Sequence, residues 1–320
     1  MKQKLIIGLS LISLLIVIVF MAKDFFRGSN RSQTNPYEYK LDNLKHIDPE
    51  LITYSEINQI KPGIINPIAI AIDGKDQIYV SGENKVVKYN SEGNQILTFD
   101  IDSSSYCINV NSSEEIYISM LDHIEVRNPD GTVKAVWEVI NERAVITSIA
   151  TTDEFVFAAD AGNKIVYQYD LKGQIIKEIG KKDTLTGAPG FIIPSPYFDL
   201  LIGTQGKLWL VNPGRHAFEN YDFNGNLISS WNRTSMLLEG FSGCCNPSHI
   251  ALLSDGSYVT SEKGLERVKI HSPNGDFKTV VASPDSFEEG TSGLDLAVDS
   301  KDRIYVLDPV KKLIRIFEKK

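Results

Sequence analysis

Short runs of apolar and β-branched residues recur along the chain, each just after a small polar turn. Six such runs mark the repeat, and their first residues are 38 to 53 positions apart. They lie at 78–80, 116–118, 155–157, 208–210, 258–260 and 304–306. Short runs of residues such as Ile, Val, Tyr, Phe and Trp that are bounded by turn residues are typical of β-strands. The chain is therefore predicted to be all-β and to repeat one unit six times.

A glycine turn follows the marked run in each of the first five units. These turns are "NSEGN", "NPDGT", "DLKGQ", "DFNGN" and "SPNGD", and they contain Gly93, Gly131, Gly173, Gly225 and Gly275. Glycine readily adopts the positive φ that tight hairpins require. In the first unit, the turns separate four strands at 68–72, 77–81, 86–89 and 95–99. Four-stranded units of this length predict a six-bladed β-propeller, whereas a β-sandwich would not repeat its turns in this fixed order.

The last unit lacks one strand. Residues 294–298, 303–307 and 313–317 supply three strands before the sequence ends, and residues 51–60 belong to no other unit. We expect residues 51–60 to be the fourth strand of the last blade, because this pairing closes the ring and removes two unpaired edges. The predicted propeller domain is 51–320.

Two stretches of the repeat resemble NHL repeats. They are "NPIAIAIDGKDQIYVSGENKVVKYNSEGNQI" in the first unit and "AGNKIVYQYDLKGQI" in the third. The resemblance covers residues 51–320 and implies a six-bladed propeller, but it says little about function. The stretch "EGFSGCCNPSHIALLSDGSYVTSEKGLERVKIHSPNG" is also similar to a membrane-anchored bacterial NHL subgroup with a GCCNP motif.

The first residues have a different character. Residues 5–22 carry no charge and are mostly Leu, Ile and Val. As a helix they would span about 27 Å, close to the thickness of a bilayer core. The apolar core of a cleaved signal peptide is usually shorter, about 7–15 residues, so we favour an uncleaved signal anchor at 1–22 and a polar tether at 23–50. The propeller is then expected in the periplasm or outside the cell, or secreted if the leader is cleaved.

Composition and charge narrow the choice of partner. Apolar residues make up 42% of the chain, which supports a real core. Lys and Arg number 33 against 41 Asp and Glu, so the net charge of -8 argues against nucleic-acid binding through a basic surface. The sequence contains no GxSxG elbow, phosphate loop or HExxH motif. Whether the protein is an enzyme stays open at this point, and no cofactor is assigned.

One end of the propeller has the longer loops. We call this end the top face; it is formed by the loops that lead into first strands and those that follow second strands. Residues 180–196 and 231–247 are long loops of this kind, and long loops on a rigid scaffold often carry binding sites. The candidate ligand-binding residues there are Cys244, Cys245, Arg215, His216, Glu262, Lys263, Arg267, Asp160 and Asn163, with Asp122 and His123 nearby.

Cys244 and Cys245 are adjacent, and three interpretations of the pair stay open. They could form a strained vicinal disulfide in an oxidising compartment. They could bind a soft metal ion together with His216 or His249. They could also be two small residues that pack a tight loop. Cys107, on the innermost strand of the second unit, is expected to be a buried apolar residue. The favoured function is a binding module for a peptide, glycan or partner protein, and the alternative is a redox- or metal-dependent component that uses the cysteine pair.

Overall fold

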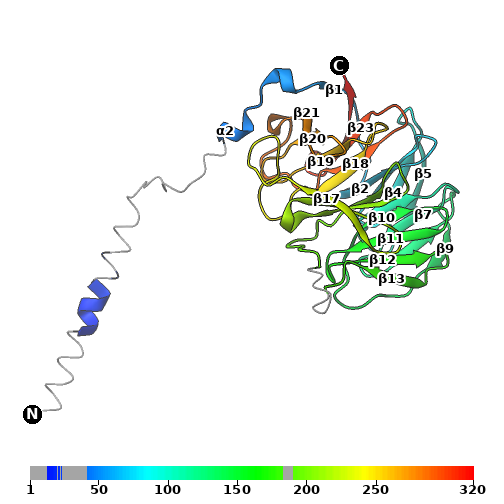
Figure 1. Ribbon diagram of the computed structural model, residues 1–320, viewed down its shortest axis with the longest axis horizontal. Helices are drawn as coiled ribbons and strands as arrows, with labels where there is room; N and C mark the ends of the chain where they lie inside the picture. The colour runs from blue at the N-terminus through cyan, green and yellow to red at the C-terminus, as the bar shows by residue number, and fades with distance from the viewer. Residues whose placement is uncertain (1–12, 20, 22, 24–41, 183–189) are drawn as a thin grey trace, which may run out of the picture. The chain divides into compact units, whose positions relative to one another are not determined.

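Six four-stranded antiparallel sheets make up the repeated part of the chain (Figure 1). The computed structural model describes residues 13–19, 21, 23, 42–182 and 190–320. Five sheets are built from consecutive strands. Their strands are β2 (Pro67–Ile72), β3 (Ile78–Gly82), β4 (Lys85–Tyr89) and β5 (Gln95–Asp100) in blade one; β6 (Ile108–Val110), β7 (Ile116–Ser119), β8 (Ile124–Arg127) and β9 (Val133–Val136) in blade two; β10 (Ile146–Thr151), β11 (Phe155–Asp160), β12 (Ile165–Asp170) and β13 (Ile175–Ile179) in blade three; β14 (Leu200–Ile202), β15 (Leu208–Asn212), β16 (Ala217–Tyr221) and β17 (Leu227–Asn232) in blade four; and β18 (His249–Leu252), β19 (Tyr258–Ser261), β20 (Val268–His271) and β21 (Phe277–Ala282) in blade five.

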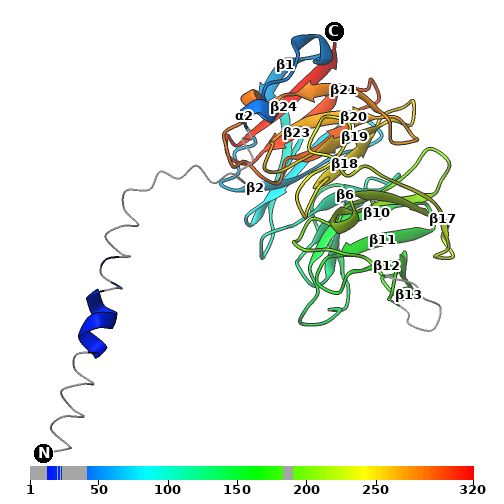
Figure 2. The same ribbon diagram turned by 60° about the vertical axis from the view of Figure 1, so that its left-hand side comes forward.

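The sixth sheet joins the two ends of the domain. It contains β22 (Asp295–Val298), β23 (Ile304–Asp308), β24 (Leu313–Lys319) and β1 (Tyr54–Ile60) in the order β1-β24-β23-β22. Strand β1 pairs antiparallel with β24, with Tyr54 opposite Lys319 and Ile60 opposite Ile314. Figure 2 shows the blue and red strands side by side near the C-terminus. The strand expected at residue 51 begins at Tyr54, because Pro49–Leu51 form a short 3-10 helix.

The innermost strands form a closed ring. Each of β2, β6, β10, β14, β18 and β22 contacts the next, and β22 also contacts β2. Apolar side chains fill the spaces between neighbouring blades. One cluster joins Ile70 and Val80 of blade one to Tyr305 and Leu307 of blade six. Second strands such as β3 are consequently buried on both faces, whereas outermost strands such as β9 keep most side chains exposed.

The five predicted glycine turns are present. Gly93, Gly131, Gly173, Gly225 and Gly275 have φ between 84° and 87°. Gly173 also lies against Trp137 of the preceding blade, so that a Cβ atom there would lie 2.5 Å from the indole ring. Both positive φ and close packing therefore require glycine at this turn.

The predicted anchor at 5–22 and tether at 23–50 lie largely outside the described residues. Residues 13–19 are helical, and α2 (Asp42–Lys45) precedes the propeller. Within the part of the chain that the structure describes, no helix is both long and apolar enough to span a bilayer. Residues 42–320 form one compact unit.

Candidate site at the top of the channel

One position in each innermost strand forms a layer around the central channel. The second strand of each blade contains a buried triplet, and the position lies opposite the residue that follows this triplet. Strand pairing places four residues there: Ala69, Ser148, His249 and Asp295. Cys107 and Asp199 hold the same position in blades two and four. Their backbone carbonyls accept hydrogen bonds from the amides of Ser119 and Val211, which follow the triplets of those blades. Four of the six residues lie at or just before the start of the first strand of their blade: Cys107, Asp199, His249 and Asp295. Ala69 and Ser148 are each the third residue of that strand. The layer is therefore near the top face.

The three charged residues of this layer lie in consecutive blades. Asp199, His249 and Asp295 come from blades four, five and six, and they converge on the channel. His249 Nδ1 lies 3.2 Å from Asp295 Oδ1 and 3.8 Å from Asp199 Oδ2. Between 12% and 15% of each of the three side chains is exposed. The other half of the layer is small, since it consists of Ala69, Cys107 and Ser148.

Backbone amides hold both carboxylates in place. Asp199 accepts hydrogen bonds from the Ile250 and Leu200 amides and from the Ser148 hydroxyl. Asp295 accepts from the amides of Ile70 and Leu296. Because Ile250 and Ile70 belong to the next blade around the ring, each aspartate also links two blades.

Burial and charge shift the titration of this cluster. Burial raises the pKa of Asp199 to about 6; the nearby Asp295 carboxylate adds to this rise, and His249 opposes it. Burial alone would lower the pKa of His249, but the carboxylates of Asp295 and Asp199 outweigh it and raise that pKa above its ordinary value. The cluster therefore stabilises positive charge, whether a proton on His249 or another cation.

A cavity of about 190 Å³ opens beside the cluster. Asp199, His249 and Asp295 line one side, and Cys107, Ser148 and Tyr106 are also among its lining residues. Burial raises the pKa of the Cys107 thiol, which agrees with its expected role as an apolar core residue. The polar groups are thus gathered on part of the wall, and small side chains leave space next to them.

Two side chains connect the channel to the cysteine pair. The Tyr197 and His249 rings pack edge to face with centroids 5.7 Å apart. Lys263 Nζ lies 4.8 Å from the centroid of the Tyr197 ring, in a cation–π arrangement. The charge of Lys263 also acts on Cys245. Tyr197 and Lys263 therefore lie between the channel cluster and the cysteine loop.

Cys244 and Cys245 are both free thiols, with Cys244 exposed and Cys245 buried. Their sulfurs are 3.2 Å apart. Burial opposes ionisation of Cys245, but Ser195, Cys244 and Lys263 together hold the pKa of its thiol below its ordinary value. Hydrogen bonding to Cys245 raises the pKa of Cys244. The inner sulfur is therefore the more easily ionised of the two.

His216 lies beside the cysteine loop, but its ring contacts the loop backbone. Its Nε2 is within hydrogen-bond distance of the Gly243 carbonyl oxygen, and its Nδ1 is 3.0 Å from the Thr234 hydroxyl. A carbonyl only accepts, so Nε2 carries a proton and, in the neutral ring, Nδ1 accepts from Thr234. Both nitrogens are engaged, which argues against His216 as the metal ligand that the sequence suggested.

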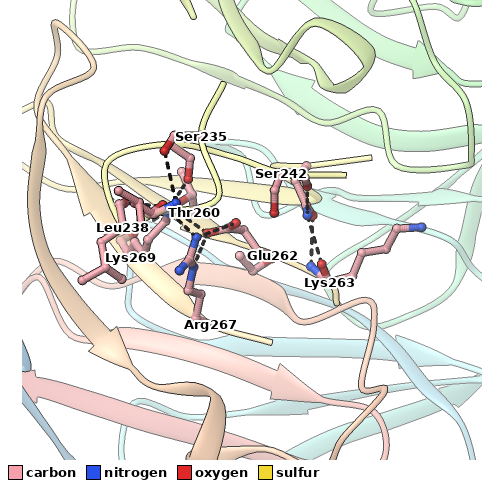
Figure 3. A network of polar contacts seen from close by, with 12 residues as sticks. Ser235, Leu238, Ser242, Thr260, Glu262, Lys263, Arg267 and Lys269 are labelled. Carbon is pink, nitrogen blue, oxygen red and sulfur yellow. Dashed lines mark hydrogen bonds and ion pairs between the residues drawn. The ribbon is translucent and has the colours of Figure 1, made fainter. Parts of the chain in front are cut away.

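Glu262 and Arg267 are fully buried in an ion network with Lys269 (Figure 3). Arg267 Nε lies 2.9 Å and Lys269 Nζ 2.7 Å from Glu262 Oε1. The two cations also donate to backbone carbonyls of the long loop before blade five, at Leu237, Leu238 and Gly240. These side chains hold the loop to the blade and do not reach the surface as ligand contacts.

The remaining predicted residues are local contacts. Asp160 accepts hydrogen bonds from the amides of Val145, Gly162 and Asn163, and from the Asn163 side chain, so this pair shapes its own loop. Arg215 is partly exposed and donates to the Gly190 carbonyl. Asp122 and His123 form a hydrogen bond with each other at 2.7 Å.

Sequence reasoning missed Asp199, Asp295 and Tyr197. A signal for the two aspartates was present, because Asp199, His249 and Asp295 each precede the marked run of their unit by nine residues. Ala69 and Cys107 precede theirs by the same number. In the third blade the triplet equivalent to Ile78–Val80 begins at Val156 and not at Phe155, because Val156 pairs with Tyr169 as Ile78 pairs with Tyr89. The spacing of nine residues therefore does not apply to Ser148. No comparable signal marks Tyr197, which lies in the long loop before blade four.

Comparisons with known proteins establish the fold only. No protein-family model matches the chain, and no curated protein does. Among solved structures, a streptogramin B lyase is 12% identical over 83% of this chain and 98% of that chain, with a TM-score of 0.60. A virginiamycin B lyase from Staphylococcus aureus is 12% identical over 83% and 99%, with a TM-score of 0.57. The WD40 propeller domain of Doa1 is 13% identical over 79% of each chain, with a TM-score of 0.54. The six-bladed propeller is supported, while the NHL assignment and its GCCNP subgroup stay predictions.

Proposed function

We propose that this chain is a binding module that recognises a peptide, a glycan or a loop of a partner protein at the top of its channel. The observation that carries the proposal is the convergence of Asp199, His249 and Asp295, near the top face, on the cavity of the central channel. Tyr197 and Lys263 lie beside this cluster, so the site offers an aromatic face and both signs of charge. Propellers generally use such faces for binding or scaffolding.

The size of the cavity limits what it can receive. Pockets for drug-sized ligands usually measure about 300–1,000 Å³, and this cavity measures about 190 Å³. It therefore holds one side chain or a similar small group, while the rest of the ligand lies on the rim. A peptide loop or a glycan end, which can present a single group, fits this shape.

Screening the full-length chain against arrays of peptides and glycans tests the proposal. The best hit should bind at least tenfold more weakly to Tyr197→Ala and Lys263→Ala, because each removes part of the rim. Lys278→Ala is the matched control: Lys278 is exposed, bonds Asp255 at a turn on the opposite face, and should leave affinity unchanged. A hit that binds all four proteins equally would contradict a top-face site.

The location of the module is a separate part of the proposal. The uncharged stretch at 5–22 supports an anchor that holds the propeller outside the cytoplasm. The chain should fractionate with membranes and lose its propeller to protease added outside intact cells or spheroplasts. Protection from that protease would contradict an extracytoplasmic domain.

The thiol pair favours a second function, dithiol–disulfide exchange. The sulfurs are 3.2 Å apart and Cys245 has the lowered pKa. Once a local opening of its loop exposes it, the Cys245 thiolate can attack a small-molecule disulfide. One thiolate of the oxidant leaves, and Cys244, after losing its proton, displaces the second thiolate from the mixed disulfide. Two electrons and two protons pass from the pair to the oxidant, which is reduced to two thiols.

Oxidised glutathione tests this second function. The native chain should lose two reactive thiols and the mass of two hydrogen atoms, without retaining glutathione. Cys244→Ser should stop at a mixed disulfide on Cys245. The exchange would be ruled out if the native chain formed a mixed disulfide on Cys244 alone and no disulfide between Cys244 and Cys245.

A further inference from the structure

The donor atoms of the charged cluster are spaced as ligands of one small cation. One ligand atom each from Asp199, His249 and Asp295 lies within 4.8 Å of the others. Metal–ligand bonds of about 2.0–2.2 Å place neighbouring ligands roughly 3.0–3.5 Å apart. His249 Nδ1 and Asp295 Oδ1 already have such a separation, at 3.2 Å, and Asp199 Oδ2 lies 3.8 Å from the same nitrogen. Only a small inward movement of Asp199 is needed.

We propose that Asp199, His249 and Asp295 bind one divalent transition-metal ion at the top of the channel. An imidazole nitrogen with two carboxylate oxygens suits Mn²⁺, Fe²⁺ or Zn²⁺ better than a soft thiolate-preferring ion. The inference deepens the proposed function: three protein ligands leave coordination positions open, and an oxygen atom of the bound peptide or glycan can occupy one of them.

The carboxylates are oriented as metal ligands usually are. Backbone amides from the neighbouring blades fix Asp199 and Asp295, and Ser148 adds a hydroxyl to Asp199. Such outer contacts hold ligating side chains in position. The two oxygens that face His249, Asp199 Oδ2 and Asp295 Oδ1, each accept one backbone amide hydrogen bond and so retain a lone pair for a cation.

The hydrogen bonds that link neighbouring blades do not by themselves explain why aspartates occupy positions 199 and 295. The equivalent positions in blades one, two and three are Ala69, Cys107 and Ser148, and the ring is continuous there without a carboxylate. All three ionisable ligands are instead consecutive around the ring, so they face one point.

The cavity supplies the space that a metal ion needs. It lies directly against the three ligands, and its volume is about 190 Å³. In liquid water each molecule takes up about 30 Å³. The cavity therefore has room for an ion and several water molecules that complete its coordination, with Cys107 and Ser148 also lining the space.

Metal binding is tested with the full-length chain after treatment with a chelator. Mn²⁺ is titrated and its free form followed by electron paramagnetic resonance; Zn²⁺ competition is followed in the same samples. Native chain should bind one Mn²⁺ or Zn²⁺ per molecule, and Asp295→Asn and His249→Gln should each weaken binding at least tenfold. Asp73→Asn is the matched control, because Asp73 is also buried and bonded to backbone amides but lies in a turn away from the cluster.

The variants are chosen so that folding does not obscure the result. Asn at 295 can still accept the Ile70 amide hydrogen bond, and near-ultraviolet circular dichroism reports whether each variant keeps its packing. Absence of one-to-one binding of either ion, or equal binding by all four proteins, would overturn the metal site. Because no peptide or glycan is present, this failure would leave the proposed ligand binding untouched, and the array screen can fail without affecting the metal titration.

Discussion

His271 is a buried imidazole among aromatic rings. The rings of Phe241 and Trp231 have centroids 5.0 and 5.9 Å away. Its charged neighbours, Lys269, Arg233 and Arg267, are all cationic. Burial, assisted by Lys269, lowers the pKa of His271 to about 3, so the folded protein keeps this ring neutral.

Replacing His271 with Phe should make stability less dependent on pH. An unfolded histidine takes up a proton near pH 6.5, whereas the folded one does so only near pH 3. Between these values the unfolded state binds more protons, so stability falls as pH falls, by up to about 1.4 kcal/mol per pH unit. Thermal unfolding of native chain and His271→Phe at pH 7.5, 6 and 4.5 should diverge progressively toward low pH.

The exposed His46 provides the control for this comparison. His46→Gln should follow the native pH profile, because it leaves His271 and its buried surroundings unchanged. Parallel profiles for native chain and His271→Phe would show that the buried ring does not resist protonation.

His216 has a different effect, since it braces the cysteine loop through Gly243 and Thr234. Cys245 is buried, so alkylation requires a local opening of that loop. Loss of a hydrogen bond worth about 1 kcal/mol should speed alkylation of Cys245 by iodoacetamide about fivefold in His216→Ala. Cys244, which is already exposed, is the internal control, and an equal increase at both sulfurs would contradict a bracing role.

At the scale of elements, the long loop before blade five is held by buried charge. Glu262 lies between Arg267 and Lys269, and the cations donate to the loop carbonyls. Burial lowers the pKa of Lys269 to about 8, although Glu262 opposes this shift. The single carboxylate therefore stabilises two buried cations and, through them, the loop.

Removing that carboxylate should destabilise the protein strongly. Glu262→Gln leaves two buried cations without their counter-ion, and breaking such a pair typically costs about 3–5 kcal/mol. Hydrogen exchange at residues 237–240 should accelerate before the blade unfolds. Glu289→Gln removes an exposed carboxylate that bonds Lys45, and should change stability by less than about 0.5 kcal/mol. Equal effects of the two changes would mean that the network does not anchor the loop.

At the scale of the whole molecule, the architecture was readable from local patterns and the channel site was not. The short runs of β-forming residues and the turns at Gly93 or Gly225 depend on neighbouring residues, so the repeat and its closure could be predicted. Asp199, His249 and Asp295 are about 50 residues apart in sequence, and only ring closure brings them together. Their individual contexts are ordinary strand starts.

Two predicted roles changed for the same reason. Glu262 and Arg267 were placed on the right face, but burial could not be inferred because the covering loop comes from residues 237–240. His216 was correctly expected near the cysteine loop, yet hydrogen bonds to Gly243 and Thr234 occupy its ring. Position on a face follows from topology, whereas side-chain contacts depend on how distant loops pack.

Ring closure itself depends on one non-covalent strand. Strand β1 covers the edge of β24, buries Tyr54 and places Glu56 against Arg315, whose Nε lies 3.0 Å from Glu56 Oε1. A chain that begins at residue 61 loses these contacts and exposes β24 as an unpaired edge, whereas one that begins at residue 42 keeps them. Exposed edges promote pairing with another chain. We expect the shorter protein to unfold at a clearly lower temperature and to elute as oligomers or aggregates in size-exclusion chromatography, and the longer one to remain monomeric. Strand β1 leads through residues 61–66 into β2 of blade one, whose Ile70 amide bonds Asp295, so the shorter protein should also bind Mn²⁺ more weakly. Equal melting temperature and equal elution of the two proteins would show that β1 is dispensable for the ring.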